Sequence, residues 1–313
     1  MKQEKNLKYS KLKKLDVKMK KVLLKSLADI LYAIEIRIMK KIYVWLSLHP
    51  SSKPFLSGDT YRKLSTIEYL GGKIELTKPE IIFSSGDYIN ELSHNLINAK
   101  QKFILITHHS DRSIDPRYRL LAENPQLIKW YAQNNEYLHQ KITPIPIGLE
   151  DRWRHNNGIV RDFIALRAKI VEKKPRILFG FTVSNNESER APALAVLRNL
   201  AVADEFLGSS RRYRKILMEY MFVASPPGNG IDCHRTWEAL YLGVIPIVIT
   251  RKFHEQFKDL PLLIVNEWAD LASYGESDLK DIYEEQAAKL KKLDYIWFDF
   301  WKKSIESDLV ELS

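Results

Sequence analysis

A glycine-rich turn that leads into a helix is the most specific chemical signal in this sequence. Met221–Ala224 form a short apolar run typical of a buried parallel strand, and residues 226–230 (PPGNG) interrupt regular structure. Residues 234–242 then predict a helix that ends at Gly243, and Val244–Thr250 predict the next strand. A strand, turn and helix in this order open a helix N-terminus at the carboxyl edge of a sheet, where backbone N–H groups bind phosphates.

Two charged side chains on the predicted helix could contact such a ligand, one at its phosphates and one at its hydroxyl groups. Arg235 stands at the helix start, where a guanidinium can hold a pyrophosphate through two parallel hydrogen bonds. Glu238 lies one turn later, where a carboxylate can accept hydrogen bonds from ribose hydroxyls. A solvated arginine and an exposed helix glutamate are the alternatives, and the spacing alone leaves them open.

The stretch from residue 226 to residue 247 reads PPGNGIDCHRTWEALYLGVIPI. This order of residue types resembles the nucleotide-sugar half of exostosin-like glycosyltransferases, which are inverting enzymes. The resemblance is close over residues 211–250 and looser over residues 80–270. One position departs from the family, which usually reads Cys-Pro-Arg-Gly at the turn where this chain has Ser225-Pro226-Pro227-Gly228. If the arginine of the family contacts a phosphate, another residue makes that contact in this chain, or the contact is missing.

The resemblance implies a nucleoside diphosphate sugar as the donor, with a UDP-sugar as the first expectation. The donor-binding residues that it implies are Arg211, Arg214, Gly228, Asn229, Gly230, His234, Arg235 and Glu238. The sequence contains no Asp-x-Asp pair, the usual clamp for a metal–diphosphate complex in the other major glycosyltransferase architecture. We therefore expect fixed cations and helix N–H groups to stabilise the leaving diphosphate, with no metal and no cofactor.

A polar segment that ends a strand in the first half is the expected acceptor side. The strand Phe103–Ile106 runs into Thr107-His108-His109-Ser110-Asp111, and polar residues at the carboxyl end of a strand face the cleft of an open α/β sheet. This ITHHSD stretch resembles the ITHNSD-type segment of bacterial and viral exostosin-like enzymes. An inverting transferase needs one base near the acceptor hydroxyl. Asp111 is the expected base and His108 the second choice, ahead of Glu150 and Asp151.

Three further polar residues near this strand end are expected to contact the acceptor. They are His109, Gln133 and Asn134. The alternative is that they only satisfy backbone groups of the loop. The function that we expect is therefore an inverting, metal-independent transfer of a sugar to a hydroxyl of a glycan or glycolipid. A non-catalytic protein that binds nucleotide sugars or glycans on the same fold is the rival.

Apolar runs alternate with helical stretches along most of the chain, which indicates parallel sheets covered by helices. The runs are residues 81–83, 103–106, 142–147, 176–180, 221–224, 244–250 and 262–265. We expect an α/β fold with two Rossmann-like domains facing a cleft, the GT-B arrangement that the resemblance also implies. The expected boundaries are a basic helical arm over 1–48, an acceptor domain over 55–160, a nucleotide-sugar domain over 170–275 and an aromatic-rich helix over 276–313. That last helix either docks back on the first domain or caps the second. Residues 49–58 (HPSSKPFLSG) have the composition of a linker.

The net charge of +10 comes almost entirely from the N-terminal arm, since residues 1–41 hold thirteen Lys and Arg against four Asp and Glu. A nucleic-acid-binding protein would spread this charge over a folded face, so we expect no nucleic acid partner. Apolar residues at helical spacing between Leu23 and Ile38 make the arm a basic amphipathic helix. Such a helix lies on an anionic membrane or packs on protein, and both remain open. The single cysteine, Cys233, fits a reducing compartment, so we expect a cytoplasmic protein, either free or peripheral on a membrane.

Overall fold

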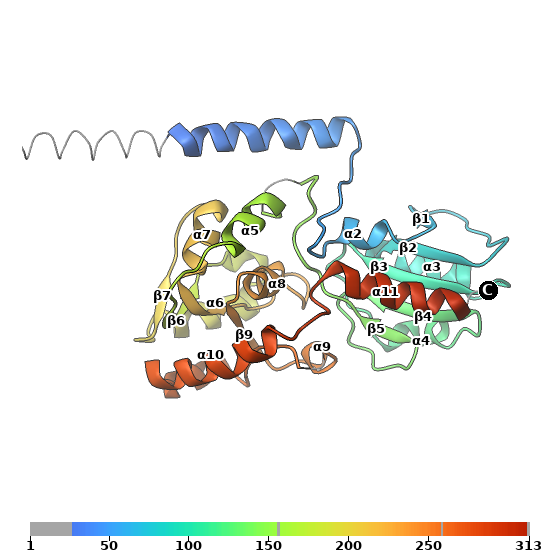
Figure 1. Cartoon of the computed structure of the whole chain (residues 1–313). Helices are drawn as coiled ribbons and strands as arrows, with labels where there is room; N and C mark the ends of the chain where they lie inside the picture. Colours follow the sequence, from blue (N-terminus) through green and yellow to red (C-terminus); the bar gives the residue numbers. More distant parts are fainter. Residues whose placement is uncertain (1–26, 155–156, 258, 312–313) are drawn as a thin grey trace, which may run out of the picture.

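The computed structural model describes residues 27–154, 157–257 and 259–311. Within them, the two halves of the chain each form a parallel sheet of five strands with helices packed against it (Figure 1). The predicted class, α/β with two Rossmann-like domains, is confirmed. Of the predicted arm, the residues before position 27 lie outside the described part of the chain.

The first sheet has the order β1-β2-β3-β4-β5. Its strands are β1 (Ile67–Tyr69), β2 (Glu80–Ser85), β3 (Phe103–His108), β4 (Leu127–Ala132) and β5 (Ile142–Pro144). The central strands β2 and β3 are buried over almost their whole length, as the continuous apolar runs predict for strands covered on both faces. Successive residues of β3 alternate between two core clusters, with Leu105 in one and Ile106 in the other.

The second sheet has the order β10-β9-β8-β6-β7. Its strands are β6 (Lys174–Phe179), β7 (Ala203–Glu205), β8 (Tyr220–Ala224), β9 (Ile245–Ile249) and β10 (Leu263–Val265). From β6 the chain first builds outward to β7 and then returns to the other side with β8. The strand order therefore reverses between β6 and β8, and in open α/β sheets ligands bind outside the carboxyl ends of the strands at such a point.

The described residues also form α-helices. They are a helix over residues 27–45, α2 (Gly58–Arg62), α3 (Ile89–Leu96), α4 (Arg119–Ala122), α5 (Val160–Arg167), α6 (Glu187–Leu197), α7 (Ser210–Leu217), α8 (His234–Tyr241), α9 (Lys252–Glu255), α10 (Glu276–Leu290) and α11 (Phe298–Asp308). α8 lies where the sequence predicted it, and Gly243 has the left-handed φ of 69° expected of a residue that ends a helix.

All seven predicted apolar runs contribute to strands, but β1, β4 and β7 were not predicted. β4 reads LIKWYA and β7 reads ADE, so their charged residues hide the apolar pattern. Pairing with stronger neighbours forms these strands: β4 pairs with β3 and β7 pairs with β6. Tertiary context outweighs local propensity here.

The C-terminal region contains two helices that serve different domains. α10 packs on the second sheet, where Leu279 joins a core cluster with Phe222. α11 crosses back and lies along the first sheet (Figure 1). Trp301 and the neighbouring apolar residues of α11 pack against Ile104 in one core cluster, and the Tyr131 hydroxyl donates to Asp308 over 2.5 Å.

The segment over residues 49–58 is not a linker, which corrects the prediction from its composition. Phe55 and Leu56 are buried. The Phe55 ring packs on Tyr241 of α8 and on Trp297, and the Leu56 N–H donates to the Tyr241 hydroxyl over 3.1 Å. The segment therefore joins the two domains through its apolar side chains, and Pro and Ser around them gave the misleading composition.

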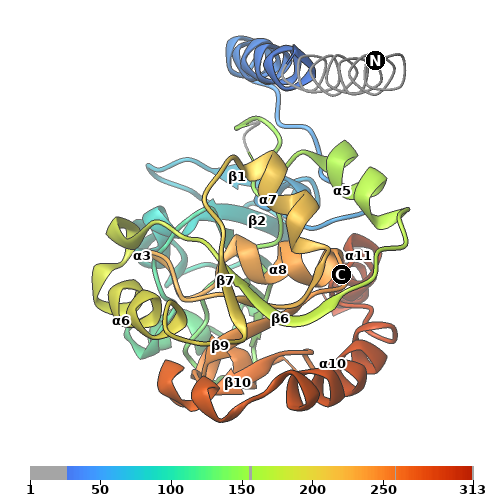
Figure 2. The same ribbon diagram turned by 90° about the vertical axis from the view of Figure 1, so that its left-hand side faces the viewer.

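The helix over residues 27–45 stands off the body next to α5 and α7 (Figure 2). Its body-facing side makes polar contacts: the Tyr32 hydroxyl donates to Asp162 over 2.5 Å, and Arg211 pairs with Asp29 at 2.8 Å. None of the helices in the described ranges is both long enough and apolar enough to cross a membrane.

Candidate functional site

A cavity of about 600 Å³ lies at the point where the second sheet reverses its strand order; we call it the β8–α8 cavity. Its walls come from the residues that follow β6 (Gly180, Phe181 and Thr182), the turn after β8 (Gly228–Gly230) and the first turns of α8. These segments meet because β6 and β8 are neighbouring parallel strands whose carboxyl ends share one edge of the sheet. The turn and the helix N-terminus thus face the cavity as the sequence predicted.

Glu238 is placed in the wall of this cavity with its carboxylate unengaged. The residue is 8% exposed, and its carbonyl accepts the Leu242 N–H over 3.2 Å, whereas its carboxylate has no hydrogen bond with the described residues. Burial raises the pKa of this carboxyl, while His234, Arg214 and Arg235 pull it down. A buried carboxylate without a partner is costly, so a site for hydroxyl donors from a ligand gives this residue its simplest explanation.

Three guanidinium groups line the same cavity, those of Arg190, Arg214 and Arg235. The Nη2 of Arg235 donates to the Gly180 carbonyl over 2.9 Å and its Nε to the Tyr213 hydroxyl over 3.2 Å. The third nitrogen, Nη1, is buried and has no partner among the described residues. Arg235 is therefore held in place on one side only, which leaves donor capacity for an anion.

The second guanidinium belongs to Arg190 of α6, which sequence reasoning missed. Its Nε donates to the Pro227 carbonyl over 2.8 Å and its Nη1 to the Thr182 carbonyl over 2.9 Å. A Cβ on Gly228 would lie 3.3 Å from Nη2, so the guanidinium rests against the glycine turn. A cation thus lies beside the turn that has Pro227 where the exostosin-like family has arginine. In the sequence, Arg190 looks like one more charge on a solvated helix.

The structure separates the two predicted arginines of α7. Arg214 lines the cavity but is almost fully buried, and its Nη2 forms an ion pair with Asp162 at 2.7 Å. Arg211 does not line the cavity, because it pairs with Asp29 and stacks over the Tyr32 ring at 3.9 Å. Arg211 therefore holds the N-terminal helix, which corrects its predicted donor-binding role. The remaining donor-binding predictions, Gly228, Asn229, Gly230 and His234, all line the cavity.

A second cavity, of about 630 Å³, lies beside the end of β3; we call it the β3 cavity. It shares Asp111, Ile147 and His234 with the β8–α8 cavity, so the two cavities meet at these residues. Asp111 is exposed there, and a Cβ on Gly230 would lie 3.3 Å from its Oδ1. The loop after β3 therefore brings Asp111 from the first domain against the glycine turn of the second.

His108, the second predicted base, is buried at the end of β3 with both ring nitrogens engaged. Its Nδ1 accepts from the His109 N–H over 2.7 Å, and its Nε2 lies 3.4 Å from the Pro146 carbonyl. Burial lowers the pKa of His108 to about 3, so the ring is neutral at physiological pH. A neutral ring with no vacant acceptor nitrogen positions His109, and this placement argues against a role as base.

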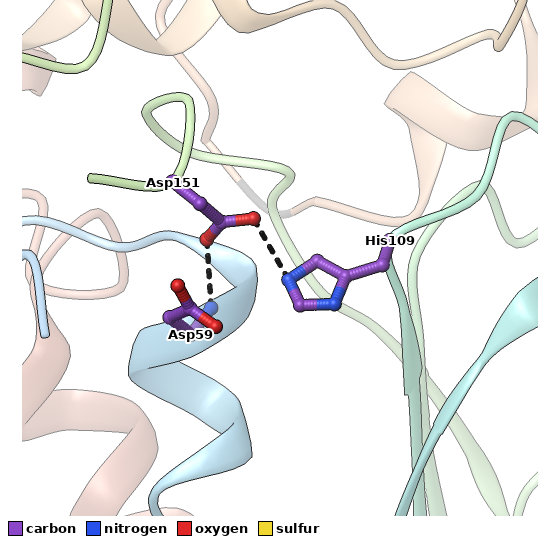
Figure 3. Close-up of side chains that lie close together, drawn as sticks. All are labelled: Asp59, His109 and Asp151. Atoms are coloured by element: carbon purple, nitrogen blue, oxygen red, sulfur yellow. Dashed lines mark hydrogen bonds and ion pairs between the residues drawn. The ribbon is translucent and has the colours of Figure 1, made fainter. Parts of the chain in front are cut away.

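His109, Asp151 and Asp59 form a cluster that the sequence did not predict (Figure 3). The Nε2 of His109 lies 2.8 Å from Asp151 Oδ2, and Asp151 Oδ1 accepts the Asp59 N–H over 2.8 Å. Burial lowers the pKa of His109, but the hydrogen bond and charge of Asp151 outweigh it and raise the pKa overall. His109 also has a φ of 59°, a strained value for this residue type that functional sites often hold.

Asp59 of α2 completes the cluster. Its carboxylate is fully buried, and burial together with the charge of Asp151 raises its pKa to about 7. The preceding residue has no space for a side chain, since a Cβ on Gly58 would lie 1.9 Å from the His109 Nε2. One ligand atom from each of Asp59, His109 and Asp151 lies within 4.8 Å of the others, so these residues could hold a metal ion. The sequence did not predict Asp59 and Gly58, because Gly58 ends the segment of linker-like composition and Asp59 directly follows it.

The two amides predicted to contact the acceptor have different positions. Gln133 lines the β3 cavity, and its buried Oε1 has no partner among the described residues. Asn134 does not line that cavity: its Oδ1 accepts the Asp232 N–H over 2.9 Å and its Nδ2 donates to the Ser110 carbonyl over 3.0 Å. Asn134 therefore joins the two domains, which corrects its predicted role.

No protein-family model matches the chain, and no curated protein sequence matches it. Solved structures with a similar fold include the α,α-trehalose 6-phosphate synthase of Burkholderia multivorans, which is 10% identical with a TM-score of 0.41, over 74% of this chain and 71% of that one. The UDP-forming α,α-trehalose-phosphate synthase of Burkholderia xenovorans is 9% identical with a TM-score of 0.41, over 74% of each chain. A trehalose-6-phosphate synthase from a study of glycosyl transfer with retention is 11% identical with a TM-score of 0.45, over 75% and 74%. At such identities, the likeness concerns the fold alone.

Proposed function

We propose that this protein is an inverting glycosyltransferase that moves a sugar from a nucleoside diphosphate to a hydroxyl of a glycan or glycolipid. UDP is the nucleotide that we propose first. One observation carries this proposal: the β8–α8 cavity combines a helix N-terminus, two partly satisfied guanidiniums and the unengaged carboxylate of Glu238. It also opens into a second cavity that has acidic and histidine side chains.

The proposed donor site separates the two ends of a nucleoside diphosphate. Glu238 accepts hydrogen bonds from the ribose hydroxyls. Arg235, Arg190 and the N–H groups of the first turn of α8 hold the diphosphate. His234 lines both cavities, and its Nδ1 contacts the Gly148 carbonyl over 2.8 Å, which leaves Nε2 for the diphosphate.

In the proposed reaction, the acceptor oxygen forms a bond to the anomeric carbon as the bond from that carbon to the diphosphate breaks. The electron pair of the broken bond stays on the diphosphate, where the fixed cations stabilise the added charge. The proton of the acceptor hydroxyl goes to a base on the opposite face of the sugar. Attack from that face inverts the anomeric configuration.

Asp111 is the base that we propose, because it lies where the two cavities meet. His109 is the second candidate, since Asp151 engages Nε2 and leaves Nδ1 for a substrate. An imidazole oriented by a carboxylate is a common general base. The two candidates differ in their pH dependence, because only a histidine base would lose activity as the pH falls below its raised pKa.

We further propose that the reaction needs no metal. Of the three arginines of the β8–α8 cavity, Arg190 and Arg235 supply the positive charge, because Arg214 is paired with Asp162. The cluster that could hold a metal ion lies elsewhere, and His109 and Asp151 already bind one another within it. Turnover that survives EDTA supports this part of the proposal. Turnover that EDTA abolishes and Mn²⁺ or Mg²⁺ restores overturns it.

The test of the proposed function is a panel of nucleotide sugars, each with a set of glycan and glycolipid acceptors. We expect release of the nucleoside diphosphate with at least one donor, and NMR of the product should show the inverted anomeric configuration. A retained anomeric configuration contradicts the inverting mechanism but does not contradict the proposed donor site. Tight donor binding without turnover on any acceptor would instead indicate a binding protein.

A further inference from the structure

The helix over residues 27–45 has two faces of opposite character. The face toward the body is fixed by polar contacts to α5 and α7: Tyr32 to Asp162, Arg211 to Asp29, and an ion pair between Arg161 and Glu35. The Arg211 guanidinium also lies over the Tyr32 ring, which reinforces its pairing with Asp29. The contacts fix which side of the helix is turned outward.

The outward face is apolar and exposed. Its residues recur at spacings of three and four and form one stripe: Leu27, Ile30, Leu31, Ile34, Ile38, Ile42 and Trp45. Ile34, in the middle of the stripe, is 47% exposed, and Trp45 at its end is 82% exposed. A helix that turns its polar side to the protein and its apolar stripe to the outside has a partner that is not the body of this chain.

The charge of the sequence around this stripe indicates what that partner is. Arg37 and Lys41 are exposed beside the stripe. Residues 1–26, which precede the helix, contain ten lysines and two acidic residues. A second copy that paired along the same stripe would bring an equally basic segment alongside, whereas an anionic bilayer surface would attract it.

We propose that the outward face of helix 27–45 binds an anionic membrane surface, with its apolar stripe in the interface and its basic residues at the lipid headgroups. Trp45 suits the interfacial end of such a stripe, because tryptophan prefers the boundary between headgroups and acyl chains. The contacts to α5 and α7 attach the helix to the second domain, so that domain lies close to the bilayer. This proposal does not rest on the proposed reaction.

The test is flotation of the full-length protein with phosphatidylcholine vesicles that contain phosphatidylglycerol, at low and high salt. We expect binding at low salt, weaker binding at high salt and little binding to phosphatidylcholine alone. The triple variant Leu31→Gln/Ile34→Gln/Ile38→Gln should reduce partitioning on the order of 1,000-fold, because each apolar side chain contributes about tenfold. The matched control is Leu70→Gln/Ile97→Gln/Leu138→Gln, which changes exposed apolar residues of the first domain and should bind normally.

Circular dichroism of both variants checks that the fold is retained, and a readout of insertion strengthens the test. With brominated lipids in the same vesicles, Trp45→Phe should remove most of the quenching of tryptophan fluorescence. Absence of vesicle binding, or unchanged binding by the Leu31/Ile34/Ile38 variant, overturns the proposal. A dimer in light scattering that this variant converts to a monomer, without vesicle binding by the intact protein, would assign the stripe to a second copy.

Discussion

The β8–α8 cavity and the β3 cavity meet at Asp111, Ile147 and His234, yet the balance of charged side chains differs between them. The β8–α8 cavity is lined by three arginines, three carboxylates and a helix N-terminus, and two of the arginines, Arg190 and Arg235, have no acidic partner among the described ion pairs. In the β3 cavity the carboxylates outnumber the arginines: four carboxylates, among them Asp111 and Asp151, face two arginines, and three histidines line it as well. A cationic cavity suits a leaving diphosphate, whereas an acidic one suits a hydroxyl that must lose a proton. In the proposed function, the donor therefore binds in one domain and the proton is removed by the other.

The largest expected effect comes from a substitution of Asp111, which lies where the two cavities meet. Asp111→Asn keeps the shape of the side chain and removes its basicity, so we expect the turnover rate to fall about 10²–10⁴-fold with UDP affinity unchanged. Steady-state kinetics and calorimetry measure the two quantities. Asp299→Asn, on the exposed face of α11, is the control. If His109→Gln loses this much activity and Asp111→Asn does not, the base is His109.

The next effect tests the β3 cavity alone. A methyl group at Gly58 would strike the His109 ring, so Gly58→Ala should displace the ring from Asp151 and cost about 1–3 kcal/mol of stability, as overpacking does. Acceptor KM should rise, and UDP affinity should stay the same. Gly275→Ala is the control, because the nearest atom to its added methyl is at 3.4 Å. Normal stability and kinetics in Gly58→Ala would show that the close fit around His109 has no functional role.

A third prediction tests the β8–α8 cavity alone. Arg190→Met removes one cation beside the glycine turn, and we expect UDP affinity to fall about tenfold, as for the loss of a charge-assisted hydrogen bond. Uridine, which lacks the diphosphate, should bind the variant as well as it binds the native protein. Arg198→Met is the control, because Arg198 forms an exposed pair with Glu205 near the end of α6. Equal losses for UDP and uridine would mean that Arg190 acts only on the fold.

The smallest effect concerns the stability of the histidine cluster as a function of pH. Asp151 raises the pKa of His109, so the ion pair stabilises the fold fully below the unfolded pKa of 6.5, and this contribution is lost as the pH rises through the raised value. The difference in Tm between the native protein and His109→Gln should therefore be larger at about pH 5.5 than at about pH 9. A difference that grows toward alkaline pH would reverse the assigned sign.

The two cavities also differ in how much of each could be predicted from the sequence. Eight of the residues that line the β8–α8 cavity lie between 228 and 238, and one local pattern identified this part of the cavity. The sequence did not predict Arg190 as a site residue, because its side chain reaches the turn from another helix. The cluster of Asp59, His109 and Asp151 in the β3 cavity combines residues from α2, the end of β3 and the loop after β5. No local pattern links Asp59 to His109. The strand end with Asp111 was predictable from its position alone, whereas the contacts that engage His108 and Asn134 depend on the assembled fold.

The claim on which the rest depends is that the β8–α8 cavity binds a nucleoside diphosphate. Calorimetric titration of UDP into the native protein, Glu238→Gln and the control Glu284→Gln tests it most directly. The control lies on the exposed face of α10. We expect the native protein and the control to bind equally and Glu238→Gln to bind about tenfold or more weakly, because one charged hydrogen bond to the ribose is lost. Equal affinity in all three proteins, or no binding of UDP or another nucleoside diphosphate to the native protein, would contradict the account.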